Sequence, residues 1–254
     1  MFAKITPNTR YIGQKLIYFK EVDSTNNLAL ELCRNRIADH GTIVLAELQT
    51  NGKGQLDRNW HSISGLNLTF SVVILQGNDT QTAPFLLNKA IALAVYNVVR
   101  KNLEGKTYIK WPNDIYHNGK KISGILIENS FSGQQLQFTI AGIGININEN
   151  MGLHPDLSAT SFYNETHKEA NREKILTELC EEIEIQCEKA LAREDVTNTY
   201  LKALSGYREL SRFSIANGNI FSSKVYDVDE YGRIAITIND EIKYFEHGEI
   251  KQII

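Results

Sequence analysis

The dipeptide Asn118-Gly119 is the feature that most restricts how this sequence can fold. It separates two strand-like stretches, 109–116 and 121–128. Asn-Gly readily adopts the left-handed backbone of a two-residue turn, which fixes the direction and the register of the strands that it joins. We therefore expect an antiparallel hairpin with three defined cross-strand pairs: His117 with Lys120, Tyr116 with Lys121, and Asp114 with Ser123.

The segments around this hairpin alternate between strand and helix patterns over the first two thirds of the chain, which predicts mixed α and β structure. Helices are expected at 24–33, 84–103 and 172–191, and further strands at 42–48, 66–75 and 138–146. After Gly206 the pattern changes to short strands at 222–228, 233–238 and 241–245. This change favours a small β barrel and a domain boundary near Ser205.

Composition limits the class of protein. The 254 residues are 42% hydrophobic and include only 4 prolines, which suits one sizeable domain plus a small one. The net charge of −3 gives no general basic field for nucleic acid, so a phosphate-binding role must depend on a local site. No apolar run approaches the roughly 18 residues that span a bilayer, and we expect no membrane association.

The cysteines and histidines also exclude some chemistries. Cys33, Cys180 and Cys187 have no motif spacing, which fits a reducing compartment, with the cytoplasm as the expected location. On one helix, Cys180 and Cys187 would lie about 10.5 Å apart along the axis, too far for a disulfide, so both are expected in the core. The six histidines form no Cys/His cluster, so any metal should arrive with a substrate.

The hairpin brings together two groups that could carry chemistry. Alternation along the strands places Asp114 and Lys121 on one face as diagonal neighbours, about 7–8 Å apart at the backbone. A fixed lysine can stabilise the charge that develops on phosphoryl oxygens during nucleotidyl transfer. Asp114 could orient Lys121, accept a proton from an amine, or assist a metal bound to nucleotide phosphates. An ordinary surface ion pair is the alternative.

The loop 49–60 is a second candidate site. Its glycines let backbone N–H groups approach an anion, and Lys53 and Arg58 supply positive charge. It is neither a P-loop nor a GxGxxG fingerprint, so a plain surface loop is the alternative. Trp60 could stack on adenine or pack in the core.

Two shorter segments carry weaker signals. In 142–148, small residues permit close approach of a ligand and Asn146 could read a nucleotide, although glycine in a strand more often marks a bulge or tight packing. In 23–27, hydroxyls and helix-start N–H groups could hold a small polar ligand, although helix capping explains them as well.

Taken together and in this order, these segments resemble the biotin–protein ligase family over most of the chain. The Lys-Trp-Pro-Asn-Asp sequence at 110–114, followed by a lysine, is the most specific part. The motifs that carry the resemblance are Ser24-Thr25-Asn26, the glycine-containing loop that ends at Trp60, Lys110-Trp111-Pro112-Asn113-Asp114, Lys121-x-x-Gly124-Ile125-Leu126 and Gly142-x-Gly144-x-Asn146.

The resemblance implies an α/β (α+β) fold. A mixed-sheet catalytic domain of the biotin/lipoate ligase type would cover residues 1–205, and a small SH3-like β barrel would cover residues 206–254. Gly248-Glu249-Ile250 is similar to the end of that second domain.

The resemblance also implies roles for single residues. Lys121 would contact the biotin carboxylate and the α-phosphate, and Asp114 would be the candidate base for the acceptor lysine. Biotin would be held by Ser24, Thr25, Asn26, Gln49, Gly52, Lys53, Lys121 and Gly124. The nucleotide would be held by Lys53, Gln55, Arg58, Trp60, Asn113, Lys121 and Asn146.

The implied reaction is that of a biotin–[acetyl-CoA-carboxylase] ligase. Biotin carboxylate attacks the α-phosphate of ATP, which brings Mg²⁺ to the site near Asp114, and gives biotinyl-5′-AMP and pyrophosphate. A lysine of a biotin carboxyl carrier protein or domain then displaces AMP. Loop 49–60 would order over the reactive intermediate and exclude water.

The sequence departs from the family pattern at two places. The family's loop is usually Gly-Arg-Gly-Arg-Arg-Gly-Arg, whereas this loop has Lys53, Gln55, Leu56 and Asp57 and keeps only Arg58 among the arginines. We therefore expect the adenylate to be held less tightly. The stretch before Ser24 is too short for the helix-turn-helix repressor domain of some members, so we expect a monofunctional ligase that binds no DNA.

Two other functions fit the same sequence. Lipoate ligases and octanoyl transferases share the catalytic fold, but the intact 110–114 motif and the C-terminal β domain favour biotin. A non-catalytic ligand sensor is the other alternative, and the presence of both Asp114 and Lys121 argues against it. An exposed edge strand could form a homodimer or bind the carrier, and the sequence leaves that choice open.

Overall fold

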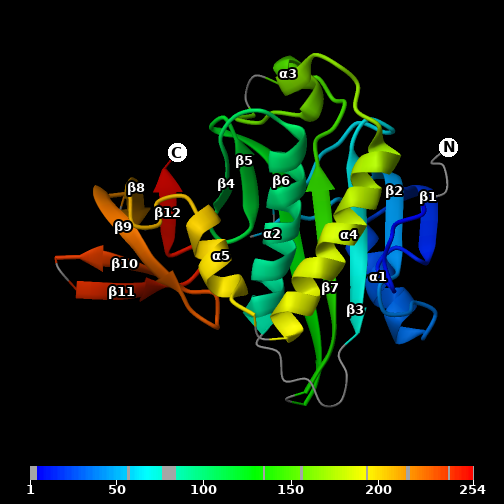
Figure 1. Ribbon diagram of the computed structural model, residues 1–254, viewed down its shortest axis with the longest axis horizontal. Coiled ribbons are helices and arrows are strands. Elements are labelled where there is room, and N and C mark those ends of the chain that lie inside the picture. Colours follow the sequence, from blue (N-terminus) through cyan, green and yellow to red (C-terminus); the bar gives the residue numbers. More distant parts are fainter. Residues whose placement is uncertain are drawn as a thin grey trace.

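The computed structural model describes residues 5–55, 58–75, 84–133, 135–154, 157–192, 194–215, 218–239 and 241–253. Within these ranges the chain forms a seven-stranded sheet and a separate five-stranded antiparallel sheet (Figure 1). The expected mixed α and β structure is therefore confirmed. None of the described helices is long and apolar enough to cross a bilayer.

The seven-stranded sheet is mixed. Its first strand is parallel to the second, with helix α1 (Thr25–Arg34) as the crossover, and all other neighbours are antiparallel. In spatial order the strands are β1 (Leu16–Val22), β2 (Ile43–Gln49), β3 (Leu68–Leu75), β7 (Gln135–Ile145), β6 (Lys120–Ser132), β5 (Asp114–His117) and β4 (Thr107–Lys110). Strand β1 was not expected from the sequence.

The stretch 109–116 is not one strand, as we had expected, but parts of β4 and β5 joined by a turn at 111–113. Pro112 has no N–H for a sheet ladder, which explains the break, and the Trp111–Pro112 peptide bond is cis. The β5–β6 hairpin has the expected turn.

The register that we expected for this hairpin is confirmed only for the first two pairs. His117 lies opposite Lys120 and Tyr116 opposite Lys121, but Ile115 then pairs with Ser123, so the expected Asp114–Ser123 pair is wrong. Ile122 is the extra residue of a β-bulge. Its carbonyl accepts a hydrogen bond from the backbone N–H of Asn146 (2.9 Å), a partner outside the hairpin.

Helices cover both faces of the large sheet. Alternation along the strands directs Ile43, Leu45 and Val72 into the core that contains helices α2 (Pro84–Asn102) and α4 (Arg172–Leu191). Val44 and Val73 point the other way, toward α1. The interior strand β3 is consequently buried along almost its whole length.

Helix α4 has the bounds that the sequence predicts. Cys180 and Cys187 are buried within it, and the three cysteines of the chain are all free, so the core assignment of these two residues is confirmed.

The five-stranded sheet has the order β11 (Glu241–Phe245), β10 (Ile234–Ile238), β9 (Ile220–Val228), β8 (Leu210–Ile215) and β12 (Ile250–Ile253). Strands β8 and β12 were not expected. Phe213, Val225, Ile234 and Ile250 are buried within this part. Three short helical segments precede the sheet: η1 (Met151–Leu153), α3 (Phe162–Thr166) and α5 (Val196–Ala203).

The turn between β9 and β10 attaches this sheet to the rest of the protein. The indole Nε1 of Trp111 donates to the carbonyl of Gly232 (3.0 Å), and the buried ammonium of Lys89 donates to the carbonyl of Val228 (2.7 Å). Gly232 has a φ of +89°, and a Cβ there would lie 2.3 Å from the Phe85 ring. Only glycine fits this turn, because both the backbone conformation and the close approach exclude a side chain.

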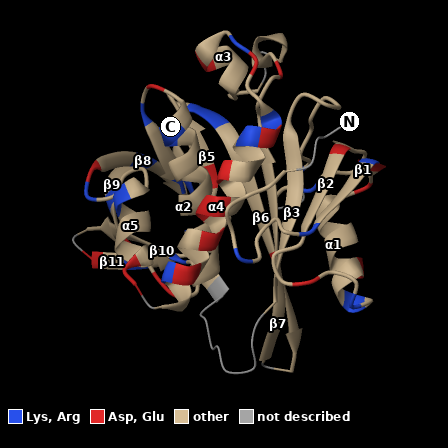
Figure 2. Cartoon of the chain, turned by 45° about the vertical axis from the view of Figure 1, so that its right-hand side comes forward, with Lys and Arg blue, Asp and Glu red and all other residues tan. Residues whose placement is uncertain are grey.

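The N-terminal segment is attached to α4 through one buried carboxylate. Figure 2 shows acidic residues, coloured red, along this helix. The carboxylate of Glu184 accepts hydrogen bonds from the backbone N–H groups of Arg10, Tyr11 and Ile12 at 2.6, 2.9 and 3.0 Å. Burial alone would raise the pKa of Glu184, but these three bonds bring the pKa below its ordinary value of 4.5.

Replacing Glu184 with glutamine should lower the free energy of unfolding by about 2 kcal/mol at pH 7, because the three N–H groups lose a charged acceptor. A group with a lowered pKa in the folded state stabilises above its ordinary pKa, and this contribution disappears as the pH falls through the lowered value. Urea unfolding should therefore show that wild type and Glu184→Gln converge at acidic pH. The exposed Glu169→Gln is the charge-matched control, and an equal loss in both variants would contradict the assignment.

Candidate functional site

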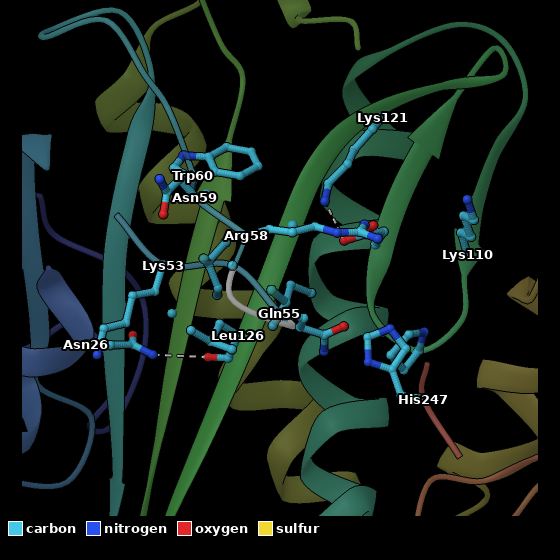
Figure 3. A pocket seen from close by; sticks show the side chains of 18 of the residues that line it. Asn26, Lys53, Gln55, Arg58, Asn59, Trp60, Lys110, Lys121, Leu126 and His247 are labelled. Carbon is cyan, nitrogen blue, oxygen red and sulfur yellow. Dashed lines mark hydrogen bonds and ion pairs between the residues drawn. The ribbon is translucent and has the colours of Figure 1, made fainter. Parts of the chain in front are cut away.

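A cavity of about 200 Å³ lies where the two sheets meet. The large sheet provides the floor, the start of α1 and loop 49–60 one side, and the C-terminal segment 247–252 the opposite side (Figure 3). Of the residues expected at the site, those that line it are Ser24, Thr25, Asn26, Gln49, Lys53, Gln55, Arg58, Trp60, Asp114, Lys121 and Gly124.

Lys121 and Asp114 form an ion pair in this cavity. The ammonium lies 2.7 Å from Oδ1 of Asp114, and the two side chains are 31% and 28% exposed. The expectation that the two would meet on one face of the hairpin is therefore confirmed. Because the pair lines a cavity and stays partly hydrated, it is better suited to binding a ligand than to stabilising the fold.

Positive charge collects around Asp114. Burial is the main cause that lowers the pKa of Lys110; the nearby charges of Lys251, Lys121 and Arg58 lower it further, against the opposing effect of Asp114. One carboxylate among four cations leaves an excess of positive charge, which attracts a polyanion such as a phosphate chain. Lys110 also lies 5.1 Å from the centre of the Tyr116 ring.

Glycines in β6 and β7 make room for the Trp60 ring. A Cβ on Gly144 would lie 2.3 Å from the indole, and one on Gly124 would lie 3.3 Å from it. Gly142 and Gly144 pair in regular register with both neighbouring strands, so close approach, and not a bulge, explains them. The Nε1 of Trp60 is buried and has no hydrogen-bond partner among the described residues.

The first turn of α1 forms the polar side of the cavity. Ser24 caps the helix by accepting from the N–H of Asn27, so the capping explanation is correct for this residue. The N–H and hydroxyl of Thr25 both lie within hydrogen-bond distance of Gln49 Oε1, at 2.7 and 3.0 Å. Asn26 is only 4% exposed, and its amide lies against Gly142.

Loop 49–60 folds back on itself beside the polar side of the cavity. The N–H of Gly54 donates to the carbonyl of Arg58 (2.6 Å), and the N–H of Trp60 donates to the carbonyl of Gly52 (2.9 Å). The ammonium of Lys53 donates to Oδ1 of Asn27 (2.7 Å), which fastens the loop to α1. Leu56 and Asp57 lie outside the described residues.

Three expected site residues do not line the cavity. Asn113 is buried and donates to the carbonyl of Ile125 (2.6 Å), and Asn146 is buried and donates to the carbonyl of Thr160 (3.0 Å). Gly52 lies within the loop, where its carbonyl accepts from the N–H of Trp60. All three support the walls in this structure, and their contact with a ligand stays a prediction.

The turn 111–113 is held by buried hydrogen bonds to three different elements. Besides the bonds of Trp111 and Asn113 described above, the carbonyl of Pro112 accepts from the hydroxyl of Tyr200 on α5 (2.6 Å). Tyr200 is fully buried. The turn leads directly into β5 and fixes the backbone position of Asp114.

Sequence reasoning missed the residues that line the cavity from the C-terminal part. They are His247, Ile250, Lys251 and Gln252. The His247 ring meets Trp111 edge-on, with 5.5 Å between ring centres. Burial is the first cause that lowers the pKa of His247, with Arg58 adding to the effect and Asp114 opposing it. The resemblance of 248–250 to a domain ending gave no signal that this segment faces the cavity.

The chain is similar in sequence to known protein ligases. Residues 18–146 match the model of the biotin/lipoate A/B protein ligase family. The chain is 32% identical over 253 residues to the bifunctional ligase/repressor BirA of Bacillus subtilis, covering 96% of this chain and 75% of that one. It is 26% identical over 238 residues to the biotin–[acetyl-CoA-carboxylase] ligase of Mycobacterium tuberculosis, covering 91% of this chain and 86% of that one.

A solved structure has the same fold. The biotin protein ligase from Aquifex aeolicus in complex with biotin and ATP superposes with a TM-score of 0.75 at 28% sequence identity, covering 94% of this chain and 99% of that chain.

Replacing Gly144 with alanine should displace Trp60. Retaining the ring beside a Cβ at 2.3 Å would cost about 1–3 kcal/mol, and the indole Nε1 has no hydrogen-bond partner in the described part of the chain to keep it there. The chain has two tryptophans, so two indole N–H signals are expected in an ¹H–¹⁵N spectrum. The Trp60 signal should move toward the position of a solvated indole while the Trp111 signal stays. Gly152→Ala, outside the cavity, should move neither; an unmoved Trp60 signal in Gly144→Ala would contradict the packing.

Proposed function

The chain belongs to the biotin/lipoate A/B protein ligase family, and on that premise we propose how its cavity works as the site of a biotin protein ligase. The enzyme makes biotinyl-5′-AMP from biotin and ATP and transfers biotin to a lysine of a carrier protein. The observation that carries the assignment of the site is a single cavity with a hydrogen-bonding side around Asn26, a cationic side around Lys110, and Lys121 between them (Figure 3).

In the first step an oxygen of the biotin carboxylate attacks the α-phosphorus of ATP, and the bond from that phosphorus to the pyrophosphate oxygen breaks. Negative charge grows on the α-phosphoryl oxygens as this happens. The ammonium of Lys121, held 2.7 Å from Asp114, would stabilise that charge and orient the carboxylate. Lys110, Lys251 and Arg58 provide charge for the departing pyrophosphate.

In the second step a carrier lysine amine attacks the acyl carbon, and the bond from that carbon to the AMP oxygen breaks. The amine must lose a proton, and Asp114, whose carboxylate lines the cavity, would accept it. Trp60 and its loop would cover the mixed anhydride and exclude water between the two steps.

Ligand contacts follow from the two sides of the cavity. Ser24, Thr25, Asn26, Gln49 and Gly124 would hold biotin, with Gly52 and Lys53 closing over it. Gln55, Arg58 and Trp60 would hold the nucleotide, and Asn113 and Asn146 would contact it after local movement.

Mg²⁺ would enter with ATP. Within the described ranges, no group of three His, Cys, Asp or Glu side chains is arranged to bind a metal ion. Asp114 is the acidic residue among the described lining residues, so it is the side chain that could join the phosphate oxygens as a ligand.

Several further assignments belong to this proposal. The catalytic domain comprises residues 1–205, and residues 206–254 form an SH3-like barrel, a division supported by the separate antiparallel sheet. The acceptor is a biotin carboxyl carrier protein or domain, the location is the cytoplasm, and the protein binds no DNA. A free sheet edge could support a homodimer.

Replacing Lys121 with alanine should lower biotin-dependent pyrophosphate release by at least about 100-fold, because a charge that acts mainly in the transition state is lost. The assay uses Mg-ATP and compares biotin, lipoate and octanoate without carrier. Lys120→Ala is the matched control, since Lys120 is exposed on the same hairpin and does not line the cavity. Release with lipoate or octanoate alone would assign the chain to another branch of the family, and equal rates in both variants would remove Lys121 from the reaction.

Replacing Gln55 with arginine should slow the dissociation of biotinyl-5′-AMP by about tenfold, because a guanidinium can form charged, bidentate bonds to the phosphate that an amide cannot. The measurement is release of preformed adenylate from the purified protein. Gln55→Lys adds charge without the planar fork and should give a smaller effect. A release rate for Gln55→Arg equal to that of wild type would show that this position does not determine retention.

A further inference from the structure

A chain of polar side chains, buried at Thr25, Asn26 and Ser71 and half-buried at Gln49 and Glu128, runs beneath the hydrogen-bonding side of the cavity and continues past it. Ser71 Oγ lies 2.8 Å from Thr25 Oγ1 and 2.6 Å from Asn26 Oδ1. Asn26 Nδ2 in turn donates to Oε2 of Glu128 at 2.7 Å. Neither Ser71 on β3 nor Glu128 on β6 lines the cavity. Their role must therefore act through Thr25 and Asn26.

Two groups accept from Nδ2 of Asn26, the carboxylate of Glu128 at 2.7 Å and the carbonyl of Leu126 at 3.4 Å, and the shorter, charged bond to Glu128 is the stronger restraint on the amide (Figure 3 shows the bond to Leu126). A carboxylate accepts hydrogen bonds and has none to donate, so the NH₂ group of Asn26 must face it. Asn26 Oδ1 then faces Ser71, and because this buried oxygen can only accept, it requires the Ser71 proton.

Counting protons gives the direction of the remaining bonds. Three oxygen–oxygen contacts, at 2.6, 2.8 and 3.0 Å, link Asn26, Ser71, Thr25 and Gln49. Only the two hydroxyl groups bring protons to them. Gln49 Oε1 can only accept, and it accepts from both the backbone N–H of Thr25 at 2.7 Å and the hydroxyl of Thr25 at 3.0 Å. The Thr25 proton therefore goes to Gln49, and the Ser71 proton goes to Asn26, its nearer acceptor, so the 2.8 Å contact between Ser71 and Thr25 has no proton of its own.

We propose that Glu128 is a positioning residue that determines specificity for a cyclic urea, an inference that rests on the proposed biotin ligase function. With the bonds ordered by Glu128, Thr25 Oγ1 keeps its lone pairs for the cavity as an acceptor. Gln49 Oε1 already accepts from Thr25, so the NH₂ group of Gln49 is the donor available to a ligand in the cavity. A donor beside an acceptor complements the carbonyl and N–H of a ureido ring, whereas a dithiolane or an alkyl chain matches neither.

The proposal is tested with Glu128→Gln and Ser71→Ala in the full-length chain, using biotin affinity measured by titration calorimetry without ATP. A glutamine can donate as well as accept, so only the longer bond to the Leu126 carbonyl (3.4 Å) is left to favour one orientation of Asn26. Both variants should bind biotin about five- to tenfold more weakly, the loss expected for about one hydrogen bond. Desthiobiotin, which keeps the ureido ring, should weaken by the same factor.

Other measurements separate positioning from a general structural role. The KM for ATP and the kcat at saturating biotin should not change, and the double variant should bind no more weakly than the weaker single variant, because both act through one chain of bonds. Glu21→Gln, an exposed position on β1 of the same sheet, is the charge-matched control.

Three outcomes would overturn the inference: unchanged biotin affinity in both variants, independent effects that multiply in the double variant, or a fall in kcat that accompanies a lower melting temperature. If Glu128→Gln does not fold, Ser71→Ala carries the test, because it removes the same ordered bond without touching the carboxylate. Failure of the wild-type chain to bind biotin would instead reject the proposed function, and this result is read before any variant is compared.

Discussion

The site depends on the turn 111–113 and on the three buried hydrogen bonds that hold it. Trp111 donates to the β9–β10 turn, the carbonyl of Pro112 accepts from α5, and Asn113 donates to β6. A buried polar group that loses its partner costs about 1–3 kcal/mol, so each bond resists displacement of the turn. Asp114 follows directly in the sequence, so the turn also fixes the position of its backbone. The ion pair with Lys121 is consequently a product of contacts with the second sheet and α5 as well as of the hairpin.

Elements with strong local signals could be predicted from the sequence. Helix α4 has the expected bounds and α2 differs by one residue, because their apolar residues recur at helical spacing over many turns. Strand β1 is half-exposed without a clear alternation, β8 buries only Phe213, and β12 has four residues, so their patterns were too weak. Glycine 142 and glycine 144 were identified as places of close approach, but which side chain approaches them depends on the path of loop 49–60.

The hairpin shows where prediction from local sequence ends. Asn118-Gly119 fixes the first two cross-strand pairs, and the bulge that follows is stabilised from a distance. The N–H of Lys121 donates to the carbonyl of Ser158 (3.1 Å), and its carbonyl accepts from the N–H of Thr160 (2.8 Å). The sequence of 109–128 alone does not predict these partners. The same reason explains why Lys251 and His247 were missed: they reach the cavity only through the packing of a distant sheet.

The contribution of segment 247–252 to the cavity has a consequence for how this architecture can change during evolution. A module that only decorates a catalytic domain can be lost, exchanged or duplicated while the chemistry persists. Here the second sheet and its β9–β10 turn provide one side of the cavity and the acceptor for the Trp111 indole. The ammonium of Lys89 on α2 also donates a hydrogen bond to the backbone of that sheet. Loss of the second sheet would therefore open one side of the cavity and leave two buried donors without these acceptors, so we expect substitutions in the β9–β10 turn to affect the turn that precedes Asp114.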